Sequence, residues 1–502
     1  MLKLTRPLKH YREAGSLNEQ INLFGFIDDH TFLTKSGDLG VVLEVKGVDY
    51  ECLDSGGIDS CTKRLESAFK VLDDRCRIYQ YLFKRNAPDL PHKTYPNPVV
   101  SAAIENRISY LQRKSESLYT LTIYYVVLFE RSRHKKSALR TLTTTNRDLH
   151  HRWTGLRTLF STQKQVLLLE SEIHRGQSAL THKVASFILQ VSDFLPIEVL
   201  PKQKAFRVLK QLLNFAPRKL ELAKIKHDTF LDYYVCDSHL ECHRGFLRID
   251  DYYAKILTLK EPSAQTFPLI FQKLLEVQAS FFVATEWKKE EPDKTRTRIH
   301  ARRRHFHNTK RSLVSYLNTS DAPVAAQDIL VDNSKEAQIH SLGLALKELE
   351  VNGNYFGEFS LTVAVYDLDL ARVEAACAEF YKVFSIHDAQ LYEERYNLLN
   401  AYLAAVPGNT AFNLRRLYIT NANYADYAFL FTLHSGDPEN HHLKREYLAV
   451  LETSHHTPYF LNLHHRDIAH TVILGRTGSG KSFLLNFLIT NLQKYEPPHI
   501  HF

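Results

Sequence analysis

The stretch HTVILGRTGSGKSFLLNF, residues 470–487, joins a short apolar run, a glycine-rich loop, a Lys-Ser pair and a second apolar run. The spacing of Gly475, Gly480, Lys481 and Ser482 fits the pattern G-x-x-x-x-G-K-[ST]. Glycines permit positive φ and leave room for inward-pointing N–H groups, which form a nest for an anion. The helix predicted to begin near Lys481 turns its positive dipole end toward the same point. The stretch therefore predicts a loop that binds nucleotide phosphates.

The residues of this loop have different expected roles. Lys481 is predicted to place a compact positive charge at the β- and γ-phosphates, and the Ser482 hydroxyl to complete the shell of a Mg²⁺ ion held by the nucleotide. The remaining residues supply backbone N–H groups. The predicted binding residues are Gly475, Arg476, Thr477, Gly478, Ser479, Gly480, Lys481 and Ser482. No catalytic residue is predicted.

The flanks of the loop have the local structure that such a motif requires. Residues 470–474 form a short, β-branched run that predicts a buried strand. Residues 481–494 have helical spacing, with Leu484, Leu488 and Leu492 in one stripe that Leu485 and Ile489 widen. Two prolines then end the helix, and residues 499–502 are predicted to begin a second strand. The order is strand, loop, helix.

Composition and length limit the class of protein. With 502 residues the chain has room for two to four domains. No stretch reaches the roughly 18 uninterrupted apolar residues of a membrane span, and the best candidate, residues 118–129, predicts a buried strand. The N-terminus lacks the apolar core of a signal peptide. We therefore expect a cytoplasmic protein whose membrane contacts are peripheral.

Six scattered cysteines do not suggest a disulfide framework and fit a reducing compartment. One cluster, CDSHLECH, holds Cys236, His239, Cys242 and His243, a set of four possible zinc ligands. The spacing matches no standard zinc motif. Ordinary packing is the favoured interpretation, and metal binding is the alternative.

Positive charge is concentrated in two stretches, although the net charge of +8 is mild for this length. Residues 294–311 contain eight Lys or Arg side chains and no acid, and a second patch covers residues 131–136. A solvated helix face is the favoured interpretation. Contact with nucleic acid, anionic lipid headgroups or an acidic partner remains open.

The pattern of apolar residues predicts an α+β region before the loop. Residues 36–129 suggest a β-α-β layout repeated once, and residues 357–394 suggest another. Residues 138–216 are mostly helical in pattern, 245–262 predict a hairpin, 267–289 a helix and then a strand, and 434–442 a linker. We predict an N-terminal region over 1–440, with subdomains 1–135, 138–290 and 312–435. Residues 441–502 are predicted to be the first part of an α/β, RecA-like P-loop NTPase domain.

Several of these stretches together resemble the CagE/TrbE/VirB family of ATPases of type IV secretion and conjugation, TrbE-type proteins above all. They are residues 26–51, 245–287 and 404–488, with 457–488 the most specific. The resemblance implies an ATPase that uses ATP and Mg²⁺, and that is docked on the cytoplasmic face of the bacterial inner membrane. It implies an oligomer that energises pilus assembly and the transfer of DNA or protein, with channel subunits and sister ATPases as partners. It assigns residues 475–482 to the Walker A loop.

The family's acidic Walker B strand has no counterpart in this sequence, which predicts a chain truncated shortly after the loop. Whether this chain hydrolyses ATP is therefore left open. The alternative function is a non-catalytic assembly or docking module of the secretion complex. Nucleic-acid binding through residues 294–311 is a third hypothesis.

Overall fold

The computed structural model describes residues 17–130, 163–309 and 333–495, apart from positions 87, 115, 226–229, 264, 352, 465 and 467. The predictions for residues 131–136 and 499–502 lie outside this part of the chain. In the described residues, no helix is both long and apolar enough to cross a membrane.

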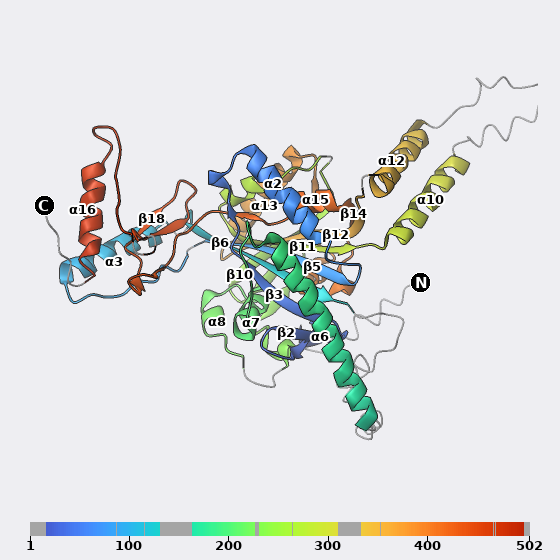
Figure 1. The fold of residues 1–502 in the computed structure, drawn as a ribbon, viewed down its shortest axis with the longest axis horizontal. Helices are drawn as coiled ribbons and strands as arrows, with labels where there is room; N and C mark the ends of the chain where they lie inside the picture. Colours follow the sequence, from blue (N-terminus) through green and yellow to red (C-terminus); the bar gives the residue numbers. More distant parts are fainter. Residues whose placement is uncertain are drawn as a thin grey trace, which may run out of the picture.

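The centre of the described structure is one antiparallel sheet of thirteen strands (Figure 1). Its main path is β1-β2-β3-β6-β5-β11-β12-β10-β9-β8, and β7, β13 and β14 pair beside it with β3, β10 and β12. The strands are β1 Leu23–Phe26, β2 Thr31–Thr34, β3 Leu39–Val45, β5 Cys76–Asn86, β6 Tyr119–Phe129, β7 Ile197–Val199, β8 Leu240–Cys242, β9 Leu247–Ile249, β10 Tyr252–Glu261, β11 Ser280–Lys289, β12 Phe356–Asp367, β13 Gln390–Glu393 and β14 Leu417–Thr420.

Helices cover both faces of this sheet, so its central strands are buried on both sides. Along β5, Ile78 and Leu82 face one core, whereas Tyr79, Tyr81 and Phe83 face the other, as the two-residue period of a strand requires. The first face is covered by α2 Ser55–Phe69, α6 Gln163–Val191, α13 Leu370–Ile386 and α15 Asn421–Asp426. The second face is covered by α7 Lys202–Gln211, α9 Leu231–Tyr234 and α14 Leu398–Ala404. The short helix α8 Pro217–Glu221 lies between α7 and α9 in the chain.

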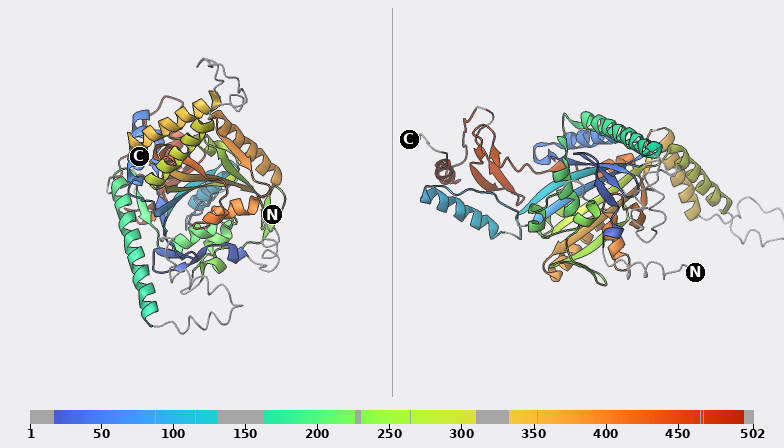
Figure 2. Two further views of the ribbon diagram at one scale, coloured as in Figure 1. Left: turned by 90° about the vertical axis from the view of Figure 1, so that its right-hand side faces the viewer. Right: turned by 90° about the horizontal axis from the view of Figure 1, so that it is seen from below.

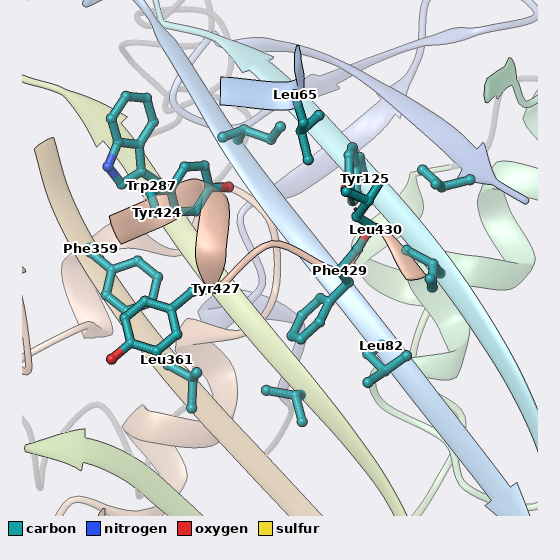
Figure 3. Close-up of a cluster of buried hydrophobic side chains, with 14 of the residues drawn as sticks. Leu65, Leu82, Tyr125, Trp287, Phe359, Leu361, Tyr424, Tyr427, Phe429 and Leu430 are labelled. Atoms are coloured by element: carbon teal, nitrogen blue, oxygen red, sulfur yellow. Dashed lines mark hydrogen bonds between the residues drawn. The ribbon is translucent and has the colours of Figure 1, made fainter. Parts of the chain in front are cut away.

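Aromatic side chains fill much of the first core (Figure 3). Trp287 of β11 stacks on Tyr424 of α15, with ring centroids 4.8 Å apart. Tyr427 stacks on Phe359 of β12 at 5.5 Å. These offset rings bury large apolar areas and attach the segment after β14 to the sheet.

A second, smaller lobe lies beside the sheet (Figure 1, left). It combines two parts of the chain: the segment 88–118, which connects β5 to β6 and contains α3 Pro98–Gln112, and residues 434–495. The shared core includes Ile104 and Ile108 of α3 with Val450 and Phe460. The later part contains β16 Glu439–Asn440, β17 Arg445–Glu446, β18 Ala449–Glu452, β19 Pro458–Leu461 and α16 Lys481–Leu492. The predicted domain boundary between residues 440 and 441 stays a prediction. Helix α3, which precedes it in the chain, packs on Val450 and Phe460, which follow it.

Two helices form an arm at the other end of the molecule (Figure 2, right). They are α10 Pro292–Thr309 and α12 Asn333–Glu350, which follow β11 and precede β12. The remaining elements are short: β4 Val48–Asp49 pairs in parallel with β15 Phe431–Thr432, and the 3-10 turns are η1 Leu17–Gln20, η2 Tyr50–Cys52, η3 Gln272–Glu276 and η4 Thr410–Phe412.

The β-α-β predictions over 36–129 and 357–394 are confirmed by β3-α2-β5-α3-β6 and by β12-α13-β13. The 245–262 hairpin is confirmed by the pairing of β9 with β10. The helix predicted within 267–289 is wrong in extent, because only the five-residue turn η3 precedes β11. Leu274 of η3 is fully buried in the first core. The chain then turns into β11, which leaves no length for a longer helix.

Lys84 of β5 is a buried lysine whose ammonium group lies among aromatic rings. Its exposed fraction is 2%. The Nζ atom donates to the carbonyl oxygen of Val277 and lies 4.3 Å from the ring centroid of Tyr119. Burial lowers the pKa of Lys84 to about 7, because a charge in this site loses its hydration.

This lysine predicts a particular pH dependence of stability. Between pH 7 and 9 the unfolded state, with an ordinary lysine pKa of about 10.4, binds more protons at this site than the folded state. Stability should therefore rise with pH across this window, by on the order of a few kcal/mol in total up to the unfolded pKa. Lys84→Met should remove that rise. Thermal melting of both proteins at pH 7, 8 and 9 measures it, and an equal slope in the two would contradict the prediction.

Candidate nucleotide-binding site

The predicted phosphate loop leads directly into α16. Gly478 and Gly480 have φ of +82° and +86°, a left-handed conformation that costs little only for glycine. Gly480 is the N-cap of the helix, so α16 begins at Lys481. A Cβ atom on Gly475 would stand 2.7 Å from the Ser479 hydroxyl oxygen. Gly478 and Gly480 thus share one reason to be glycine, the left-handed backbone, and Gly475 has another, the close approach of Ser479.

Lys481 folds back over the loop. Its Nζ atom donates to the carbonyl oxygens of Gly475 and Arg476, at 2.9 and 2.8 Å. An ammonium group has three rotatable donors, so these two bonds can be exchanged for bonds to phosphate oxygens. The charge is thereby held at the loop, where a bound anion would lie.

The start of α16 adds backbone N–H donors beside the Lys481 ammonium group. The first helical bond after the loop runs from the Leu484 N–H to the Gly480 carbonyl, at 3.0 Å. The N–H groups of Lys481, Ser482 and Phe483 come before it and have no intrahelical acceptor, as is general for a first turn. Together with the helix dipole they favour an anion. Ser482 is exposed in this turn, while residues 475–480 are exposed as well, so the loop is open to a nucleotide.

These features fit a triphosphate. Gly475, Arg476, Thr477, Gly478, Ser479 and Gly480 form the loop, Lys481 supplies the cation, and Ser482 supplies the hydroxyl that would face a magnesium ion. Residues 475–480 form the loop, and Lys481 and Ser482 are the first residues of α16; nucleotide binding by these residues stays a prediction.

The strand predicted at 470–474 is wrong. These residues pair with no strand of the described chain, and Val472 and Leu474 are 80% and 87% exposed. A strand needs a neighbour for its N–H and C=O groups. Ile473 packs against the cluster of Leu448, Ala449 and Leu488, but the stretch as a whole is not a paired, buried strand.

The apolar stripe of α16 is only partly buried. Leu488 is 7% exposed and packs against Leu448 and Ala449. Leu484 and Leu492 are partly buried in the same cluster, as predicted. Leu485, predicted to widen the stripe, is 49% exposed, because its side of the helix faces away from the β18–β19 strand pair.

The other sequence candidates lie apart from the loop. Within the described residues, no group of three or more His, Cys, Asp or Glu side chains gathers as a metal site. His239 and His243 each contact Glu241, at 3.2 Å, and all six cysteines are free thiols.

Residues 294–309 of the basic run lie on helix α10, and among its described side chains Thr295 and Ile299 are buried. Arg298 pairs with Glu290 at 2.7 Å and Arg296 with Glu350 at 3.3 Å. The prediction of a solvated helix face is confirmed for Lys294, Arg296, Arg298, Arg302 and Arg304, which are exposed; the side chains of Arg303, Lys310 and Arg311 lie outside the described part.

One contact of α16 has no signal in the sequence. Beyond the last turn of the helix, Lys494 forms a buried ion pair with Glu446, at 3.1 Å. The two residues are separated by 48 positions, and neither belongs to a recognisable motif.

Comparison with known families matches two parts of the chain. Residues 30–137 match the model of the N-terminal domain of the type IV secretion system ATPase VirB4/TrbE. Residues 442–502, which contain the phosphate loop, match the FtsK/SpoIIIE family. The first match covers the strands β3, β5 and β6 and the segment 88–118.

Curated relatives point to the same systems. The chain is 32% identical over 170 residues to the type IV secretion system protein virB4 of Bartonella henselae. The aligned part covers 33% of this chain and 21% of that protein. It is 28% identical over 159 residues to the conjugal transfer protein TrbE of Rhizobium radiobacter, covering 31% and 19%. The protein virB4 of Agrobacterium fabrum is 22% identical over 94% of this chain. The chain spans 55% of that relative's length.

Proposed function

Because this chain belongs to the VirB4/TrbE family of type IV secretion ATPases, we propose that it binds ATP and Mg²⁺ at residues 475–482. In this proposal the chain is an ATP-binding component of a type IV secretion or conjugal transfer system. Bound Mg²⁺·ATP would supply a β–γ phosphoanhydride bond, and its hydrolysis to ADP and phosphate can drive mechanical work.

One observation carries the proposal. Lys481 is held on the carbonyl oxygens of Gly475 and Arg476, directly before a helix whose first-turn N–H groups are unused. A cation, a helix N-terminus and a left-handed glycine turn at one point are what a triphosphate requires. Lys481 binds the β- and γ-phosphates, the loop N–H groups orient them, and Ser482 holds the magnesium.

The wider role follows the family. We propose that the chain works with channel subunits and sister ATPases, as a homo-oligomer peripheral to the cytoplasmic face of the inner membrane, and energises pilus assembly and transfer of DNA or protein. The relatives named for type IV secretion and conjugal transfer support this role. Contact of α10 with nucleic acid is a weaker part of the proposal.

Equilibrium binding of a fluorescent ATP analogue to the purified chain tests nucleotide binding. We expect saturable binding that requires Mg²⁺ and is displaced by unlabelled ATP. Binding that is unchanged by EDTA or by excess ATP would contradict a specific triphosphate site.

A second candidate function is a non-catalytic assembly or docking module. The large α+β region before the loop favours it, because the thirteen-stranded sheet with helices on both faces has no part in holding the phosphates. Phosphate release from ATP separates the two. Steady hydrolysis by the purified chain, lost on replacing Lys481, would exclude the docking module, whereas binding without hydrolysis would support it.

A further inference from the structure

The far end of α16 is held by a single buried carboxylate. Lys494 is 1% exposed and Glu446 is 8% exposed, and the Lys494 Nζ atom lies 3.1 Å from Glu446 Oε1. The Lys494 ammonium also lies 4.8 Å from the ring centroid of Tyr447. Tyr495 donates its hydroxyl to the Glu446 backbone carbonyl, at 2.7 Å. The residues that follow α16 are therefore attached to β17.

The same carboxylate also holds the segment 88–118. Its second oxygen, Glu446 Oε2, accepts a hydrogen bond from the backbone N–H of Lys93 at 3.0 Å. The next residue, Tyr447, donates its hydroxyl to the Pro91 carbonyl at 2.7 Å. One side chain thus connects three parts of the chain: the segment before α3, strand β17 and the end of α16.

Burial makes this connection sensitive to charge. Burial lowers the pKa of Lys494, and the neighbouring Glu446 carboxylate acts against that shift. A buried carboxylate that loses its cation is left without compensation. Displacement of α16 would separate Lys494 from Glu446 and leave both buried charges unpaired, so the ion pair favours the present position of the helix.

Further contacts join α16 and its hairpin to the segment 88–118. The Arg107 side chain of α3 donates to the Val450 carbonyl at 3.1 Å and lies 5.8 Å from the ring centroid of Phe487 on α16. Lys114 pairs with Glu452 at 2.6 Å. In the chain, this segment lies between β5 and β6, two central strands of the sheet (Figure 1).

The helix therefore has a nucleotide site at one end and this contact at the other. Its twelve residues span about 18 Å at 1.5 Å per residue, and a helix of that length moves as a unit. We infer that Glu446 is a positioning residue for the phosphate loop, and that it couples nucleotide binding at Lys481 to the stability of the segment 88–118. This inference rests on the proposed nucleotide binding.

Coupling of this kind is reciprocal. If the contact at Glu446 favours the nucleotide-binding position of α16, then bound nucleotide must stabilise the contact and the segment 88–118 with it. The effect on affinity and the effect on local stability have one thermodynamic origin, so both can be measured.

The experiment is hydrogen–deuterium exchange of the full chain with and without Mg²⁺ and the slowly hydrolysed analogue ATPγS. We expect slower exchange at 475–490 and also, by about fivefold or more, at amides of 88–118. In Glu446→Gln the nucleotide affinity should fall about fivefold or more, and the nucleotide-induced protection of 88–118 should disappear. The matched control is Glu439→Gln, an exposed glutamate opposite Glu446 in the β16–β17 pair, which should behave as wild type.

The double variant E446Q/K494M leaves no unpaired buried charge, and it gives the same measurement if the single variant fails to fold. Protection of wild type at 475–490 without any at 88–118 would overturn the inference and leave nucleotide binding intact. Wild-type affinity in the double variant would also overturn it. Absence of protection at 475–490 itself would overturn the proposed function, and this inference with it.

Discussion

Lys481→Ala is expected to lower the affinity for Mg²⁺·ATP by roughly 10- to 100-fold. A charge-assisted hydrogen bond contributes about 1.5–3 kcal/mol, and each 1.4 kcal/mol is a factor of ten. The lysine also donates to two loop carbonyls, so its removal takes away two hydrogen bonds within the loop. Titration with a fluorescent ATP analogue measures the change.

Lys444→Ala is the matched control, because Lys444 is an exposed lysine of the same lobe and lies outside the loop. It should bind as wild type. The melting temperature without nucleotide should be nearly equal in the two variants, since Lys481 contacts only exposed loop carbonyls. Equal nucleotide affinity in Lys481→Ala and Lys444→Ala would remove the loop as the binding site.

Local pattern predicted the parts of the fold in which near neighbours decide the structure. The α2 and α13 helices each lie between strands, with their apolar spacing facing the sheet, and the turn into α16 follows from glycines that alone adopt positive φ without strain. The eight residues of the predicted loop are adjacent in sequence, so their proximity needed no knowledge of the tertiary fold.

The sequence did not predict which strands pair, because strand pairing joins residues that are far apart in the chain. Strand β5 pairs with β11 along eight residues, and no periodicity in either strand names the other. The packing of α3 on Val450 and Phe460 joins segments more than 300 positions apart, as the Arg107–Val450 bond illustrates. Single-sequence pattern reports which faces are apolar, but not which partner covers them.

The stretch 470–474 illustrates the opposite failure. Its β-branched pattern predicts burial, and the structure leaves Val472 and Leu474 exposed. Propensity for a strand expresses a fit to a half-buried, paired surface rather than a preference of the isolated backbone. Where the described chain provides no pairing strand, the pattern remains without its structure.

Arg77→Met is expected to destabilise the sheet by about 3–5 kcal/mol, the usual cost of removing one partner from a buried ion pair. Arg77 is 2% exposed in β5, and its guanidinium donates to Glu130, at 2.5 Å, and to Glu286 of β11. Lys288 also donates to Glu130, at 2.5 Å. Burial alone would raise the pKa of Glu130, but Arg77 and Lys288 hold it below its ordinary value. Without Arg77, Glu130 keeps its contact with Lys288, whereas the buried Glu286 loses the Arg77 cation and keeps a hydrogen bond from Asn413.

Thermal melting at neutral pH measures this loss, and two variants define its cause. Arg77→Met/Glu286→Gln also removes the Glu286 charge that the single variant leaves without its cation, so it should recover part of the lost stability. Arg372→Met breaks the exposed pair with Glu116, whose side chains are 50% and 66% exposed, and should leave the melting temperature nearly unchanged, because water already screens that pair. If Arg77→Met melts like Arg372→Met, the buried ion pairs of Arg77 with Glu130 and Glu286 contribute no more to stability than an exposed pair does. If the double variant melts below the single one, side-chain packing rather than charge explains the loss.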